Sequence, residues 1–148
     1  MGGGGQTQAP DQTILHANTV ALNGRALLIQ GPSGAGKSML SVGLMALGAV
    51  LVADDRTVLR RVGAGLVASV PPAIAGQIEA RGIGILKADH VEAAEVSAVV
   101  DLATPETDRL PPQRSTCLLG ITLPVLHYVE SPYFAAALMQ YLRYGRYA

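Results

Sequence analysis

The segment GPSGAGKS is the part of this sequence whose residue types and spacing point most directly to chemistry. It fits the pattern G-x-x-x-x-G-K-S, in which glycines let backbone N–H groups turn inward around phosphate oxygens. A helix that begins inside the pattern adds a partial positive charge at the same place. We therefore expect a nucleotide-binding loop made of Gly31, Pro32, Ser33, Gly34, Ala35, Gly36, Lys37 and Ser38.

Two side chains at the end of this loop have specific uses in phosphoryl transfer. Lys37 would reach the terminal phosphates of a nucleoside triphosphate, and Ser38 would ligate Mg²⁺ through its hydroxyl. The alternative interpretation is a plain turn before a helix, in which the glycines have only a structural use.

An acidic pair, Asp54 and Asp55, follows a short apolar run. Two adjacent carboxylates repel each other unless a cation or a transferred proton lies between them. One of the two could hold magnesium while the other accepts a proton from a hydroxyl nucleophile. The alternative is a polar strand end that enters a turn, a position where Asp is common.

Three more residues are candidates on weaker patterns. His16 precedes the first alternating segment and could orient or deprotonate a catalytic carboxylate, although a lone histidine is more often a solvated surface residue. Glu79 stands before two near-adjacent glycines and could serve a metal, or could belong to a turn with a surface salt bridge. Arg109, in a proline-rich segment, could approach a transferring phosphoryl group or remain solvated.

Hydrophobic spacing and turn residues predict the elements that must position these side chains. A hairpin around Asn23-Gly24 leads into the loop, a helix over residues 37–47 follows, and a strand over 49–53 ends at the acidic pair. Further along we expect a hairpin over 57–70, a short helix over 73–79, a loop into a strand over 81–86, a strand over 96–102, a surface loop over 104–115, strand structure over 118–129, and a final helix over 132–144 capped by Ser131. The predicted fold is α/β: a mixed sheet with flanking helices that contains the glycine-rich loop.

Composition limits the other possibilities. The chain has 148 residues, 49% of them hydrophobic, which suits one domain with an aliphatic core over residues 13–148. Residues 1–12, with four successive glycines, are expected to form a disordered arm. Eleven basic and eleven acidic residues cancel, so the net charge does not indicate binding to nucleic acid or to an anionic membrane. A single cysteine and the lack of a leader-like start favour the cytoplasm.

Taken together, these patterns resemble the catalytic domain of HPr kinase/phosphorylase. The resemblance runs from about His16 to Pro111 and includes the loop, the acidic pair, the Glu79 segment and Asp108-Arg109-Leu110. That family phosphorylates a seryl hydroxyl of HPr, a small phosphocarrier protein, and can reverse the modification with inorganic phosphate. Its catalytic fold is related to phosphoenolpyruvate carboxykinase.

The resemblance implies a role for each candidate residue. Lys37 would bind phosphates of the donor ATP, and Mg²⁺ would be held by Ser38, Asp55 and Glu79. Asp54 is the favoured base, assisted by His16, and Arg109 would contact the transferred phosphate. HPr is the expected partner, and a homo-oligomer is the expected assembly.

Two departures from the family pattern are visible. We expect no separate N-terminal domain of the kind that longer members carry, because the sequence resembles the truncated forms of alphaproteobacteria. Where those members carry a Pro-Val-Arg-Pro-Gly-Arg-Asn-like stretch, residues 123–128 keep only Pro-Val, which leaves the reverse activity and the subunit contacts open. Two other functions remain open as well: a small-molecule kinase with the same donor site, and a nucleotide-sensing module without transfer chemistry.

Overall fold

The computed structural model describes residues 11–148, so all but the last two residues of the predicted arm (1–12) lie outside the described residues. The elements follow in the order β1 (Gln12–Leu15), β2 (Ala17–Leu22), β3 (Arg25–Gln30), α1 (Lys37–Ala46), β4 (Val50–Ala53), β5 (Thr57–Val62), β6 (Gly65–Ser69), the 3₁₀ turn η2 (Pro72–Ile74), β7 (Gln77–Ala80), β8 (Gly84–Lys87), β9 (Ala93–Pro105), β10 (Ser115–Leu118), β11 (Ile121–Tyr128) and α2 (Phe134–Tyr144). Gln12 already belongs to β1, one residue before the predicted start of the domain.

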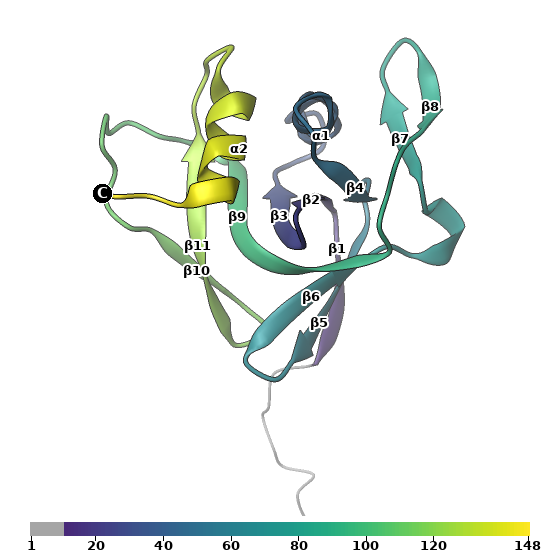
Figure 1. Cartoon of the computed structure of the whole chain (residues 1–148), viewed down its shortest axis with the longest axis horizontal. Helices are drawn as coiled ribbons and strands as arrows, with labels where there is room; N and C mark the ends of the chain where they lie inside the picture. Colours follow the sequence, from purple (N-terminus) through teal and green to yellow (C-terminus); the bar gives the residue numbers. More distant parts are fainter. Residues whose placement is uncertain (1–10) are drawn as a thin grey trace, which may run out of the picture.

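A curled mixed sheet with the order β1-β5-β6-β9-β3-β2-β4 forms the body of the molecule, and β10 and β11 extend it from β9. Figure 1 shows both helices on the same side of its central strands, with the β5–β6 hairpin turned away from them. The mixed sheet with flanking helices confirms the predicted α/β arrangement.

Strand β2 decides where the candidate site lies. It pairs antiparallel with β3 on one side and with β4 on the other, so β3 and β4 run in the same direction. The turn between β2 and β3 uses Asn23 and Gly24 with φ of 53° and 78°, the left-handed pair that a tight hairpin requires. The glycine-rich loop after β3 and the acidic pair after β4 therefore leave the sheet at one edge.

Strand β9 joins two parts of the sheet. Its first residues pair antiparallel with β6, and its later residues pair parallel with both β3 and β11. One strand therefore carries the β5–β6 hairpin and the strand that leads into the glycine-rich loop.

The core has two aliphatic layers separated by the sheet. Leu27 and Ile29 of β3 point to the layer shared with α1 and α2, whereas Ala26 and Leu28 point to the layer covered by β5 and β6. Burial on both faces explains the uninterrupted apolar run of β3. Within residues 11–148 no helix is long and apolar enough to cross a membrane.

Most predicted elements are confirmed, and three expectations are wrong. The helix expected over 73–79 is the short turn η2 followed by β7, because Gly76 adopts a φ of 70° and residues 77–80 alternate between exposed and buried positions against β8. The surface loop starts later than predicted, since β9 continues to Pro105, and its last residue, Ser115, already opens β10. Helix α2 begins at Phe134 and not at residue 132, so Ser131 is not its cap. The Oγ of Ser131 accepts a hydrogen bond from the backbone N–H of Tyr133, which precedes the helix.

The double-sided burial of β3 predicts a large effect of truncation there. Leu27 is fully buried between the sheet and the helices, so Leu27→Ala should lower the free energy of unfolding by about 2–5 kcal/mol through lost contacts and a cavity. Ile85→Ala, at a side chain that is 64% exposed, is the matched control and should change it by less than about 0.5 kcal/mol. Urea unfolding followed by circular dichroism measures both, and equal effects would contradict the assignment of the core.

Candidate functional site

The glycine-rich loop joins the end of β3 to the start of α1. Gly34 and Gly36 have φ of 84° and 98°, in the left-handed region that side chains with a Cβ rarely adopt. The backbone N–H of Ala35 donates to the carbonyl of Pro32 at 3.0 Å and closes the turn. A Cβ added to Gly31 would stand 3.1 Å from the Cβ atoms of Ala35 and Leu102, so the loop packs tightly on the end of β9.

Lys37, the first residue of α1, folds back over this loop. Its Nζ donates to the carbonyls of Gly31 at 2.8 Å and Pro32 at 3.2 Å, and the residue is only 9% exposed. The ammonium group, which has three hydrogens to donate, is thus held against the start of the loop.

Asp54 is the centre of the contacts at this edge of the sheet. The Oγ of Ser38 donates to its Oδ1 at 2.7 Å, and the Nδ2 of Asn18 donates to the same oxygen at 2.6 Å. The backbone N–H of Glu79 donates to Oδ2 at 2.9 Å. Three donors from three different elements therefore fix the position of one carboxylate.

The other two acidic candidates lie next to Asp54 in different ways. Asp55 is exposed and has a φ of 68°, a left-handed conformation that is uncommon for a residue other than glycine. Glu79 reaches the site through its backbone and carries an exposed side chain on β7. β7 and β8 form a separate two-stranded sheet, which Figure 1 shows projecting beside α1.

The oxygen atoms at this edge fit a magnesium ion that also binds phosphate. Mg²⁺ in kinase sites is usually held by one or two carboxylates together with substrate phosphates and water. The hydroxyl of Ser38 meets the Asp54 carboxylate, and the exposed carboxylates of Asp55 and Glu79 belong to residues next to it, so oxygen ligands of that kind are available beside the loop. No cluster of three or more His, Cys, Asp or Glu side chains suited to a metal occurs in the described range, 11–148.

His16 and Arg109 are not brought into contact with Asp54. His16 lies between β1 and β2, directly before Ala17. Ala17 pairs with Gln30 at the end of β3, so the backbone of His16 lies at the same edge of the sheet as the glycine-rich loop. Arg109 lies in the segment between β9 and β10. Both residues are exposed, and neither takes part in the side-chain hydrogen bonds formed within residues 11–148.

Sequence reasoning missed two polar residues of the site. Asn18 and Ser41 are fully buried, and Nδ2 of Asn18 donates to Oγ of Ser41 at 3.1 Å. A signal for Asn18 was present, because an amide inside the apolar strand pattern ANTVAL must find partners if it is buried. Nothing in the local pattern identified those partners.

Comparison with known proteins agrees with this geometry. The model of the HPr serine kinase C-terminal domain matches residues 7–107. The HPr kinase/phosphorylase of Caldicellulosiruptor bescii is 35% identical over 124 residues, which cover 75% of this chain and 40% of that protein. That of Caldanaerobacter subterraneus subsp. tengcongensis is 46% identical over 79 residues, or 53% of this chain and 26% of that protein. The chain spans about a third of the length of the curated relatives it matches first, at 32% and 30%.

The solved structure of the Hpr(Ser) kinase/phosphatase from Coxiella burnetii matches with a TM-score of 0.77 and 29% identity, covering 88% of this chain and 94% of that one. The curled mixed sheet, with the loop between β3 and α1 and the carboxylate at the end of β4, puts this chain in the α/β class of fold that the solved structure represents. The chain belongs to the family of the HPr serine kinase C-terminal domain. The predicted family is thereby confirmed, and the likeness to phosphoenolpyruvate carboxykinase stays a prediction.

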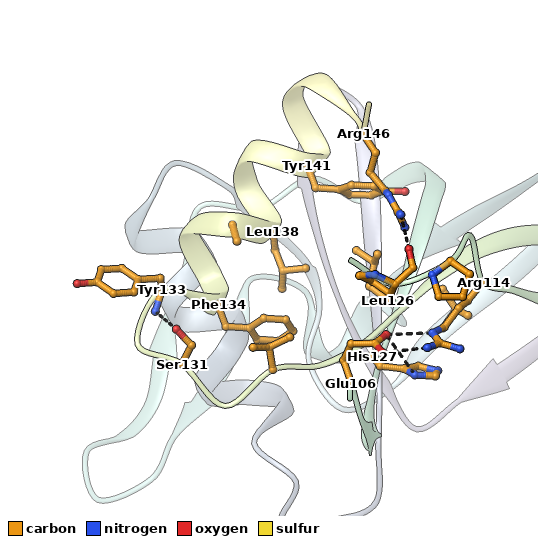
Figure 2. Close-up of a pocket in the computed structure, with 15 residues that line it drawn as sticks. Glu106, Arg114, Leu126, His127, Ser131, Tyr133, Phe134, Leu138, Tyr141 and Arg146 are labelled. Atoms are coloured by element: carbon orange, nitrogen blue, oxygen red, sulfur yellow. Dashed lines mark hydrogen bonds and ion pairs between the residues drawn. The ribbon is translucent and has the colours of Figure 1, made fainter. Parts of the chain in front are cut away.

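A second feature of the structure lies away from the loop. A cavity of about 260 Å³ separates β11 and α2 from the segment between β9 and β10. Figure 2 shows Phe134 and Leu138 of α2 facing it, with Glu106, Arg114 and His127 at the opposite end. Arg114 donates to both carboxylate oxygens of Glu106, each at 2.9 Å, and Nδ1 of His127 lies 3.8 Å from Oε1 of Glu106.

The bidentate ion pair joins Glu106 and Arg114, which lie on either side of Arg109 in the sequence. Hydrogen bonds from the Arg114 side chain and from the backbone N–H of Asp108 lower the pKa of Glu106 from 4.5 to about 2. A carboxylate whose pKa is lower in the folded chain stabilises it at pH values above the unfolded pKa. This contribution is lost as the pH falls from about 4.5 toward about 2.

We therefore predict that Glu106→Gln reduces the acid sensitivity of the fold. Between about pH 6 and about pH 3, the urea midpoint of the wild type should fall further than that of Glu106→Gln, since glutamine has no proton to gain. Glu130→Gln, at an exposed position after β11, is the control and should follow the wild type. Equal acid shifts in Glu106→Gln and the wild type would show that the pair contributes nothing to folding.

Proposed function

We propose that this chain is a protein-serine kinase that transfers the γ-phosphoryl group of ATP, with Mg²⁺, to a seryl hydroxyl of an HPr-type phosphocarrier protein. The observation that carries the proposal is the 2.7 Å contact between Ser38 at the end of the loop and Asp54 at the end of β4. This contact supports the proposal, because the Asp54 carboxylate would lie as a proton acceptor beside the bound phosphate and magnesium. The family membership supports the same acceptor.

Each group at the site has one task in this mechanism. The backbone N–H groups of the loop and the N-terminus of α1 bind the phosphates, and Lys37 exchanges its contacts with two loop carbonyls for phosphate oxygens. Bound Mg²⁺ would neutralise charge that develops on the β- and γ-phosphates. Ser38, with Asp55 and Glu79 close to Asp54, would hold the ion.

Asp54 handles the proton of the incoming hydroxyl. As the seryl oxygen bonds to the γ-phosphorus, the bond from that phosphorus to the bridging oxygen of ADP breaks, and the seryl proton passes to the Asp54 carboxylate. The three hydrogen bonds to Asp54 orient it before the acceptor arrives. His16 would assist this base, and Arg109 would contact the transferred phosphate after movement of its exposed segment.

The proposal also includes the location, the assembly and the partner of the protein. The chain would act in the cytoplasm as a homo-oligomer, on a protein partner and without nucleic acid or membrane. Residues 123–128, where the family resemblance is weakest, lie within β11 and contribute Val125, Leu126 and His127 to the cavity beside α2. The reverse, phosphate-dependent reaction remains an expectation from the resemblance alone.

A transfer assay tests the function directly. ATP labelled at the γ-phosphate, Mg²⁺ and a candidate HPr protein should give label on a seryl residue with the wild type. Lys37→Ala should weaken nucleotide binding about 10–100-fold, because a hydrogen bond to a charged group contributes about 1.5–3 kcal/mol. ATP binding without label on HPr would reject the proposed acceptor and favour a small-molecule acceptor or a nucleotide sensor.

The two adjacent aspartates should separate in their effects. Asp54→Asn should lower the transfer rate about 10²–10⁴-fold, with the dissociation constant for Mg·ATP within about 3-fold of the wild type, because a general base is lost. Asp55→Asn should instead weaken the Mg²⁺ dependence of nucleotide binding. Calorimetric titration with and without Mg²⁺ measures nucleotide binding. Thermal melts check folding, because the NH₂ group of asparagine at position 54 could face the Glu79 N–H, which now donates to the carboxylate. If Asp54→Asn weakened the Mg²⁺ dependence and Asp55→Asn lowered the transfer rate, Asp55 would be the base and Asp54 the magnesium ligand.

A further inference from the structure

Asn18 is a fully buried polar residue at the candidate site, and the proposed reaction assigns it no role. It stands in β2 between the ends of β3 and β4, opposite Ile29, and has no exposed surface. A buried amide without hydrogen bonds costs several kcal/mol, about 2–7 depending on the reference state. All polar groups of Asn18 are bonded, so its partners reveal what it does.

The two ends of the amide contact different parts of the acidic pair. Nδ2 donates its two hydrogens mainly to Oδ1 of Asp54 at 2.6 Å and to Oγ of Ser41 at 3.1 Å, and a longer contact of 3.5 Å joins it to Oγ of Ser38. Oδ1 accepts the backbone N–H of Asp55 at 3.0 Å. Since a carboxylate needs a donor and an N–H needs an acceptor, the chemistry of the partners fixes the orientation of the amide.

Ser41 connects the same group to α1. Its hydroxyl donates to the carbonyl of Lys37 at 2.9 Å, so its lone pairs are free to accept from Asn18. One side chain of β2 is therefore bonded to Asp54, directly after β4, and to Ser41 of α1, the helix that also carries Ser38.

We propose that Asn18 is a positioning residue for phosphoryl transfer: it holds the Asp54 carboxylate toward Ser38 and fixes the left-handed backbone at Asp55. The inference rests on the proposed function for the reaction that it serves. An amide suits both tasks, because it presents a donor and an acceptor on one rigid plane. Aspartate would place a like charge against Asp54, and alanine would leave the Asp55 N–H without its acceptor.

The test compares Asn18→Ala with Thr19→Val, a matched control in the neighbouring position of the same strand. Thr19 is equally buried, and its hydroxyl is bonded to Thr57, which keeps its own bond to the carbonyl of Ala17 in the variant. Asn18→Ala should lower kcat about 10–100-fold, the range expected when a catalytic group is misplaced, and leave the dissociation constant for Mg·ATP within about 3-fold. Thr19→Val should leave both unchanged.

Amide hydrogen exchange measured by NMR tests the backbone role of Asn18 independently of enzymatic activity. The N–H of Asp55 should exchange at least about 10-fold faster in Asn18→Ala than in the wild type, because its acceptor is gone, and should be unchanged in Thr19→Val. A kcat of Asn18→Ala equal to that of Thr19→Val, or unchanged exchange at Asp55, would overturn the inference. If the wild type transfers no phosphate, the proposed function fails, and exchange at Asp55 still decides whether Asn18 fixes the backbone.

Exchanging the two groups separates stability from catalysis. Asn18→Asp should destabilise the fold by placing two carboxylates in contact, and Asn18→Asp with Asp54→Asn should restore the melting temperature, since an amide and a carboxylate again face each other. The double variant should remain at least about 100-fold slower in transfer, because the carboxylate stands at position 18. Recovery of transfer together with stability would show that the location of the carboxylate does not matter and would contradict the positioning role.

Discussion

The placement of β2 between β3 and β4 is the constraint on which the rest of the site depends. Antiparallel pairing on both sides forces the two outer strands to run in one direction, and their carboxyl ends reach the same edge. A glycine-rich loop and an acidic residue that follow different strands thereby come within hydrogen-bond distance. The usual crossover from one parallel strand to its neighbour is replaced here by a hairpin strand inserted between them.

The site that results is organised around one carboxylate. Asp54 accepts hydrogen bonds from β2, from α1 and from the backbone of β7. Asp54 has intermediate exposure, so these hydrogen bonds orient a carboxylate that is still accessible from solvent. Asp55, one residue further, is held in an unusual backbone conformation by the same strand that orients Asp54.

The sequence was informative where structure is encoded locally. The loop pattern, the helix that follows it, the Asn23-Gly24 hairpin and the strand before Asp54 depend on neighbouring residues, and each lies where it was predicted. The contacts of Asn18 could not be predicted, because Ser41 and Asp54 come from segments that only the sheet brings together.

The short helix expected over 73–79 failed for a related reason. Its apolar residues are compatible with a helix, and the decisive factor is pairing with β8, which a local pattern does not contain. The cavity beside α2 was also invisible, since its lining comes from the segment after β9, from β11 and from the last helix.

The position of β9 has a consequence for how the chain reaches this fold. β9 lies between β6 and β3 in the sheet, yet it is synthesised after both of them. Until it is in place, the hairpin β5–β6 and the unit from β2 to β4 have no shared strand, and each leaves an unpaired edge next to apolar surface. Sheet closure must therefore wait for long-range pairing, which is slow compared with helix or hairpin formation. In a nascent chain that stops before β9, the edges of β6 and β3 that β9 covers in the folded sheet are open to pairing with other chains.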